Sequence, residues 1–141
     1  MTKVNQTIAK IMDERFGCDN IISLATHDGE RLAVRSVNAY YEHNAFYIVT
    51  YALSSKIQQI ERNRDVAVCG EWFNAHGFAE NLGHVLKPEN SEMMSKLRAV
   101  FAEWYENVHT NENDPKTILL RINLTDGVLF SHGTRYDVDF T

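Results

Sequence analysis

The sequence has 141 residues, a length that suits one domain and is ample for a hydrophobic core. Its 44% hydrophobic and 23% charged residues are typical of a globular protein rather than a disordered one. The formal net charge of -5 argues against broad binding to nucleic acid or to a membrane surface, since both favour a basic protein. Cys18 and Cys69 form no CxxC pair, and no signal peptide or apolar run of membrane-spanning length occurs. We therefore expect a cytoplasmic protein with two reduced thiols.

The N-terminal part of the chain predicts one helix followed by a meander of three strands. Apolar residues recur with helical spacing over residues 2–16, and Gly17 is placed to end that helix. Asp28-Gly29 between two β-type runs is a strong hairpin signal, and residues 42–44 form a second turn. The three strands are predicted at residues 21–26, 31–41 and 45–51.

A second helix is predicted to begin at Ser55 and to end near Asn63. Ser55 and Gln58 have the S-x-x-Q spacing of a capping box, which makes Lys56 the first helical residue. Two further strands, at residues 65–73 and 78–86, are expected to form a hairpin across residues 74–77.

A longer helix is predicted from Ser91 to about Val108. Its apolar side chains fall at steps of three and four and form one stripe: Met94, Leu97, Phe101, Trp104 and Val108. The stripe is bulky for one helix of a small domain, so it is expected to face either the core or a partner subunit.

Two last strands, at residues 117–124 and 128–132, are predicted to pair across Thr125-Asp126-Gly127. The chain then carries about seven strands that follow one another and are mostly antiparallel. This pattern predicts a mainly β (α+β) fold: a small closed or split barrel of six to seven strands with flanking helices, formed by residues 1–141 as one domain.

The common catalytic and metal-binding motifs are missing. The six histidines include no HExxH pair, and no Cys/His cluster has the spacing of a zinc site. Exposed or locally bonded histidines are the favoured interpretation and no metal is expected, although a haem ligand among them stays open. GxSxG, P-loop and GxGxxG sequences do not occur either.

Two cations point instead to an anion site. Lys56 lies in the first turn of a predicted helix, where the helix dipole disfavours a positive charge. Arg35 shares a strand face with apolar residues, so it either extends past the sheet end or pairs with an anion. Together with the Ser54 and Ser55 hydroxyls and the free N–H groups of the helix, both cations can converge on one phosphate. The competing interpretation makes Lys56 a solvated surface residue.

Four segments in order resemble the pyridoxamine 5′-phosphate oxidase-like, FMN-binding split-barrel family. They are ISLATHDG, the R-S-V of residues 35–37, FYIVTY-x-x-SSK at residues 46–56 and I-x-R-N-R-D-V-A-V at residues 60–68. The resemblance covers roughly residues 6–86, with weaker support through residue 132. It implies a split barrel that binds FMN in a groove between two subunits of a homodimer, with haem or a deazaflavin as alternative cofactors.

The resemblance also implies roles for individual residues. The FMN phosphate would meet Arg35 and the helix start at Ser54, Ser55 and Lys56. The flavin would lie along two strand segments: Ser36, Val37 and Asn38, and Val49, Thr50 and Tyr51.

The implied function is that of an FMN-dependent oxidoreductase acting on a small molecule, or of a non-catalytic flavin- or haem-binding protein. The true oxidase ends in a segment rich in Arg and Trp that helps to hold the vitamin phosphate. This chain ends in RYDVDFT, with Arg135 as its nearby basic residue. Vitamin oxidation is therefore not expected, and no catalytic side chain is predicted.

Overall fold

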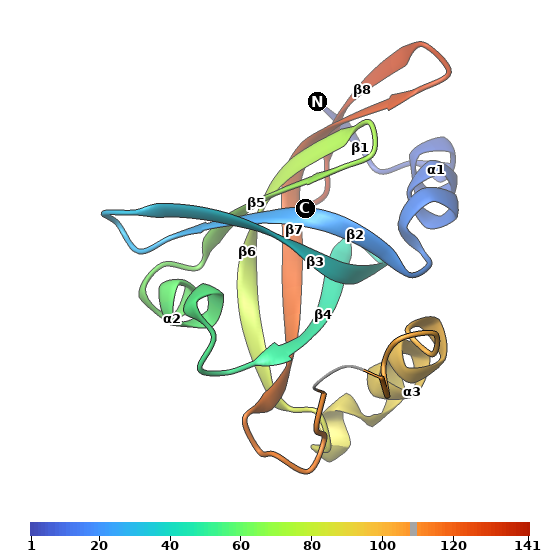
Figure 1. The fold of residues 1–141 in the computed structure, drawn as a ribbon. Helices are drawn as coiled ribbons and strands as arrows, with labels where there is room; N and C mark the ends of the chain where they lie inside the picture. The colour runs from blue at the N-terminus through green and yellow to red at the C-terminus, as the bar shows by residue number, and fades with distance from the viewer. Residues whose placement is uncertain (108–109) are drawn as a thin grey trace.

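The fold is an antiparallel β-barrel with helices around it (Figure 1). A computed structural model of the chain describes residues 1–107 and 110–141. The strands in this part of the chain are β1 (Thr2–Lys3), β2 (Asn20–His27), β3 (Leu32–Glu42), β4 (Ala45–Tyr51), β5 (Asp65–Gly70), β6 (Phe73–His84), β7 (Thr117–Ser131) and β8 (Thr134–Asp139). Six of them close into a barrel in the order β7-β4-β3-β2-β5-β6, with β6 pairing back onto β7, and β8 and β1 extend the sheet beyond β7. The predicted α+β barrel is confirmed.

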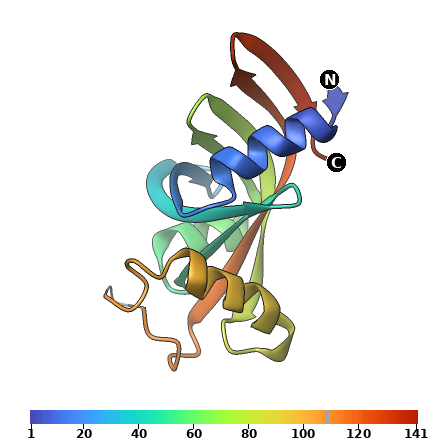
Figure 2. The same ribbon diagram turned by 90° about the vertical axis from the view of Figure 1, so that its right-hand side faces the viewer.

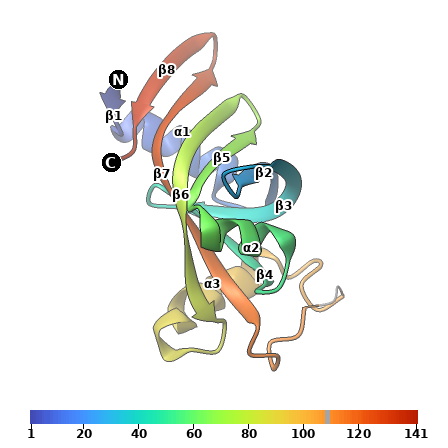
Figure 3. The same ribbon diagram turned by 90° about the vertical axis from the view of Figure 1, so that its left-hand side faces the viewer.

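The helices lie on the outside of the barrel. They are α1 (Gln6–Phe16), α2 (Ser55–Arg62) and α3 (Ser91–Val100), the last preceded by the short 3-10 helix η1 (Pro88–Asn90). Figure 2 shows α1 crossing one side of the barrel with α3 below it, and Figure 3 shows α2 on the opposite side. Each helix in the described part of the chain is too short or too polar to traverse a lipid bilayer.

The first helix begins later than predicted. Asn5 is its N-cap, and the Asn5 side chain accepts a hydrogen bond from the Ile8 N–H at 2.9 Å. The residues before it, Thr2–Lys3, pair in parallel with β8 instead of adding a helical turn. Gly17 follows the end of the helix, as predicted.

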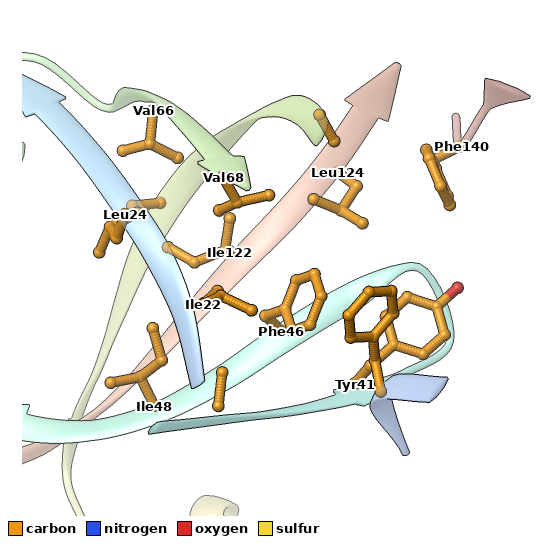
Figure 4. Packing of buried hydrophobic residues seen from close by; sticks show 14 of the residues in the cluster. Ile22, Leu24, Tyr41, Phe46, Ile48, Val66, Val68, Ile122, Leu124 and Phe140 are labelled. Atoms are coloured by element: carbon orange, nitrogen blue, oxygen red, sulfur yellow. The ribbon is translucent and has the colours of Figure 1, made fainter. Parts of the chain in front are cut away.

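Apolar side chains that alternate along the strands fill the barrel (Figure 4). On β2, Ile22 and Leu24 are fully buried, and they face Phe46 and Ile122 from the other wall. Phe16 of α1 closes this core, with its ring 5.6 Å from the ring of Phe46. Burial of each such side chain stabilises the fold by about 1.5–3 kcal/mol.

A second apolar cluster lies between α3 and the outer face of the barrel. Met94, Leu97 and Phe101 have no exposed surface, and they pack with Leu119 of β7. The apolar stripe of this segment therefore faces the chain's own barrel. The helix ends at Val100 rather than near residue 108, because Phe101 caps it and residues 101–107 turn back; Val108 lies outside the described residues.

The last predicted hairpin is wrong, because Thr117–Ser131 forms one continuous strand. Asp126-Gly127 looks like a turn signal, yet this stretch pairs with β6 on one edge and with β8 on the other. A Cβ at Gly127 would lie 2.8 Å from the Asn74 backbone oxygen, so the glycine permits a close approach of strands rather than a turn. The chain turns later, at residues 132–133, and β8 is a strand that the sequence prediction missed.

The hairpin between β5 and β6 turns at residues 71–72 rather than at residues 74–77. Gly77 therefore lies inside β6, where a Cβ would meet the Asn123 backbone oxygen at 2.4 Å. By contrast, the turns at Asp28-Gly29 and at residues 43–44 are confirmed.

Candidate functional site

The barrel is split where β3 and β4 diverge. These two strands pair only from Tyr40↔Tyr47 to Glu42↔Ala45. Beyond that point β3 continues along β2, and β4 continues along β7. The two facing strand edges leave backbone N–H and C=O groups without a ladder partner among the described strands, so these groups are free to bind a ligand.

A groove of about 490 Å³ opens at this split. It is lined by Val37, Asn38, Ile48, Val49, Thr50, Lys56 and Trp104. Five of the ten predicted cofactor-binding residues, Lys56 among them, therefore line one surface. Its size is within the range of small-molecule sites in proteins.

Arg35 lies on the inner face of β3, as the alternation predicted, and is held by the neighbouring strand and helix. Its Nη1 donates to the Thr26 hydroxyl at 2.7 Å and to the Leu24 carbonyl at 3.2 Å. The Thr26 hydroxyl in turn donates to the side-chain oxygen of Gln59 on α2. Burial lowers the pKa of the Arg35 guanidinium below its usual range. The Nε and Nη2 groups keep donors for a further partner.

Lys56 reaches back from the first turn of α2 toward β4. Its Nζ donates to the Thr50 hydroxyl at 2.8 Å and to the Ser54 hydroxyl at 3.3 Å. Burial, and then the positive charge of Arg35, lower the pKa of Lys56 below its usual 10.5. The lysine is therefore half-buried beside a second cation.

These two cations have no counter-charge in the described part of the chain. None of its ion pairs includes Arg35 or Lys56. The first hydrogen bond of α2 runs from the Gln58 N–H to the Ser54 carbonyl, so the N–H groups before Gln58 have no acceptor within the helix. Partly buried positive charge without a partner is costly, and a bound anion would remove that cost. The arrangement fits a phosphate group.

The predicted capping box is wrong. Ser54 is the N-cap, no side chain caps the helix, and Gln58 donates to the Leu53 carbonyl instead. Lys56 is thus the second helical residue and not the first. The Ser54 hydroxyl, which would normally accept from the helix, accepts from Lys56.

Three other predicted residues lie outside the groove lining. Ser36 is exposed on the outer face of β3, Tyr51 is exposed at the end of β4, and Ser55 is the exposed first residue of α2. Their side chains are therefore not positioned to line this groove, although the backbone of Ser55 belongs to the helix start.

Sequence reasoning missed Trp104, which it assigned to the stripe of a long helix. Trp104 lines the groove from the turns that follow α3, and its Nε1 donates to Asp19 at 2.9 Å. It also missed Ile48 in the groove and Thr26 and Gln59 behind Arg35. Thr26 is only 1% exposed, and a polar residue at an inward position of a buried strand was the available signal.

A larger hollow, of about 640 Å³, lies between α1 and the β7–β8 hairpin. Its Lys10 and Glu14 face each other at 3.9 Å, and its Arg15 donates to the backbone carbonyls of Glu71 and Trp72. Within the described residues, no three His, Cys, Asp or Glu side chains gather in a way that could hold a metal ion.

No protein-family model and no curated protein sequence matches the chain. Solved structures do match its fold. An FAD-binding protein from Mesorhizobium loti has a TM-score of 0.67 at 13% identity, over 88% of this chain and 92% of that one. A protein of the pyridoxinephosphate oxidase family from Clostridium acetobutylicum, related to general stress protein 26, has a TM-score of 0.65 at 12% identity, over 96% of both chains.

A heme-binding protein from Mycobacterium smegmatis has a TM-score of 0.64 at 10% identity, over 87% of this chain and 54% of that one. Identities at this level show a shared fold. The chain therefore has the split-barrel fold that these solved structures share, and the sequence resemblance implied this fold.

Proposed function

We propose that the protein binds FMN in the groove between β3 and β4, with the phosphate between Arg35 and Lys56. One observation carries this proposal: Lys56 lines the groove at the N-terminus of α2, Arg35 is connected to the same helix through Thr26 and Gln59, and no described carboxylate neutralises either cation. A phosphate dianion supplies the missing charge and accepts from the free N–H groups of the helix. The FAD-binding neighbour supports a flavin as the ligand.

The rest of the groove suits the ring system of a flavin. Val37, Val49 and Ile48 give it an apolar floor, and the diverging strand edges offer backbone donors and acceptors for the polar edge of a ring. The bound flavin would supply the redox chemistry of an oxidoreductase acting on a small molecule. The chain itself anchors the phosphate, orients the ring and shields one side of it from water.

A non-catalytic flavin- or haem-binding protein is the second candidate. Lys56 is the one ionisable side chain among the residues that line the groove, so the lining supplies no acid–base pair for turnover. It also supplies no His, Cys or Met as an axial haem ligand, which favours flavin over haem. Anaerobic mixing of the flavin-loaded protein with NADH or NADPH separates the two candidates, because bleaching of the flavin absorption at a catalytic rate indicates an oxidoreductase.

The phosphate site is tested by comparing FMN with riboflavin, which lacks the phosphate. Replacing Lys56 by Ala should weaken FMN binding about ten- to hundredfold, because one charge-assisted contact contributes roughly 1.5–3 kcal/mol. Riboflavin binding should change little. Arg35→Lys should also weaken FMN binding, because lysine keeps the charge but loses the forked geometry. Both affinities are measured by titration of flavin absorption or fluorescence.

Lys10→Ala is the matched control, since Lys10 is an exposed lysine on α1 outside the groove. It should leave both affinities unchanged. Equal, small effects of Lys56→Ala on FMN and riboflavin would contradict the phosphate site.

We also propose that the protein is a homodimer, through the outer face of β2 and β3. Three large apolar side chains of this face are open to solvent: Ile21 is 65% exposed, Leu32 87% and Val34 70%. The strand register places Ile21 opposite Asn38, which lines the groove. A second copy on this face would lie beside the groove mouth and cover the apolar residues.

A further inference from the structure

Trp104, held by Asp19, forms one wall of the groove in a fixed orientation. The indole Nε1 of Trp104 donates to one carboxylate oxygen of Asp19 at 2.9 Å, and the amide of Asn38 donates to the other at 3.0 Å. Asp19 lies between α1 and β2, Asn38 lies on β3, and Trp104 follows α3. One carboxylate therefore ties together three segments that are far apart in the sequence, and two of its partners line the groove.

The indole is supported from behind. The ring of Phe101, which is fully buried, lies 4.9 Å from the Trp104 ring at an interplanar angle of 36°. Trp104 itself is only partly buried and lines the groove. Because packing fixes the ring on one side and a charge-assisted hydrogen bond fixes its edge, the indole loses little freedom when a ligand binds.

The groove thus offers two kinds of contact to a ligand, one electrostatic and one aromatic. Lys56, with the charge of Arg35 nearby, gives one part of the groove a positive charge, and Trp104 gives another part an aromatic surface. A ligand that matches both has an anionic group and a planar aromatic ring in one molecule. This step rests on the proposed FMN site, and it concerns the ring rather than the phosphate.

We propose that Trp104 contacts the flavin ring and sets the affinity for it, and that Asp19 is the positioning residue that holds the indole in place. Stacking on an aromatic side chain is worth roughly 1–3 kcal/mol per base in nucleic-acid sites. Loss of the indole should therefore weaken ring binding by about five- to hundredfold. The effect does not depend on the phosphate.

The test measures affinities for FMN and riboflavin in the full chain with Trp104→Ala, Trp104→Phe and Asp19→Ala. Trp104→Ala should weaken both ligands by the same factor, whereas Lys56→Ala weakens FMN alone. Trp104→Phe keeps a ring and loses the hydrogen bond, so its loss should be smaller and again equal for both ligands. Trp72→Phe is the matched control, because Trp72 lies in the turn between β5 and β6 outside the groove lining, and it should change neither affinity.

Asp19 is tested through Trp104. Asp19→Ala should weaken both flavins in the natural background and should have a much smaller effect when Trp104 is already Ala. If Asp19→Ala weakens flavin binding by the same factor whether residue 104 is Trp or Ala, Asp19 does not act through the indole.

Fluorescence of the bound flavin gives a readout that an unfolding effect does not imitate. An indole in contact quenches flavin emission, so bound FMN should be dim in the natural protein and in Trp72→Phe, and brighter in Trp104→Phe. If the natural protein binds FMN and Lys56→Ala acts selectively, but the Trp104 variants bind both flavins with unchanged affinity and brightness, the wall proposal is overturned and the phosphate site stands. If the natural protein binds neither flavin, the proposed function itself is overturned.

Discussion

Lys56 shows a local electrostatic conflict that a bound anion would resolve. A lysine in the first turn of a helix is opposed by the helix dipole, and here Arg35 adds a second positive charge nearby. The side chain is held toward the groove by two hydroxyl groups rather than by a carboxylate. An anion in the groove would offset both the repulsion from the helix dipole and the repulsion from Arg35. The affinity for that anion should therefore depend on the protonation of Lys56.

FMN affinity should therefore decrease at alkaline pH. Burial and Arg35 lower the pKa of Lys56 in the free protein below 10.5, and a bound dianion raises it again. The complex then holds the proton more tightly, so affinity is complete below the free-protein pKa and falls as pH rises through it. Titrations between pH 7 and about pH 10.5 check this, because the decline should begin below pH 10.5.

Riboflavin carries the same ring and provides the control for ionisation of the flavin itself. The ratio of FMN to riboflavin affinity should fall with pH in the natural protein and stay level in Lys56→Ala. A ratio that stays level in both proteins rules out Lys56 as a phosphate ligand.

The stability of the apo protein should change with pH in the opposite direction to FMN affinity. The unfolded chain binds the Lys56 proton more tightly than the folded chain does, so the contribution of Lys56 to the free energy of unfolding increases as pH rises.

At the scale of elements, two glycines without side chains allow β6 and β7 to approach each other closely. Gly77 and Gly127 both lie where the two strands approach closely, on either side of a shift in register. The same strand, β7, also pairs with β8 at its C-terminal end. These glycines serve packing rather than turns.

Replacing Gly77 by Ala should destabilise the protein by about 1–3 kcal/mol, the usual cost of overpacking. The new Cβ would meet a backbone oxygen at 2.4 Å, and a backbone atom in a paired strand moves less easily than a side chain. Denaturant unfolding of the apo protein measures the loss. Gly29→Ala is the comparison, because its Cβ meets nothing within 4 Å and costs only the strain of a positive φ of 97°, about 1 kcal/mol. A Gly77→Ala protein as stable as the natural one would contradict the close approach of these strands.

At the scale of the molecule, two apolar faces among the described residues differ in what covers them. The face of α3 with Phe101 is covered by the chain's own barrel, whereas Ile21, Leu32 and Val34 remain exposed on the outer face of β2 and β3. An exposed apolar face of this kind favours contact with another protein surface, and the proposed partner is a second copy. The two faces are therefore expected to respond differently to a charge.

Val34→Glu should convert the dimer into a folded monomer, because the charge would be buried in the interface but lies in water in the monomer. Phe101→Asp should instead unfold the subunit, because Phe101 has no exposed surface. Light scattering at micromolar concentration gives the mass, and circular dichroism gives the fold. A natural protein with the mass of one chain when loaded with FMN would contradict the dimer. An undiminished dimer mass for Val34→Glu would place the interface on another face.

Local signals in the sequence determined much of this protein. Strand alternation placed Arg35 on the inner face of β3, and Asp28-Gly29 marked a hairpin, because side-chain direction and turn conformation depend on near neighbours. The order of the motifs around Lys56 was enough to imply the split-barrel fold. Short-range chemistry also predicted the cation pair, since each member broke a local rule.

Only the tertiary structure decided what depends on distant partners. Gly77 and Gly127 resemble turn residues until β6 and β7 are seen side by side, and the end of α3 depends on how Phe101 packs on the barrel. Trp104 became a groove residue because Asp19, which lies 85 positions away in the chain, holds its indole. Contacts of this range leave no periodic trace in a sequence, because their partners are brought together by the closure of the barrel.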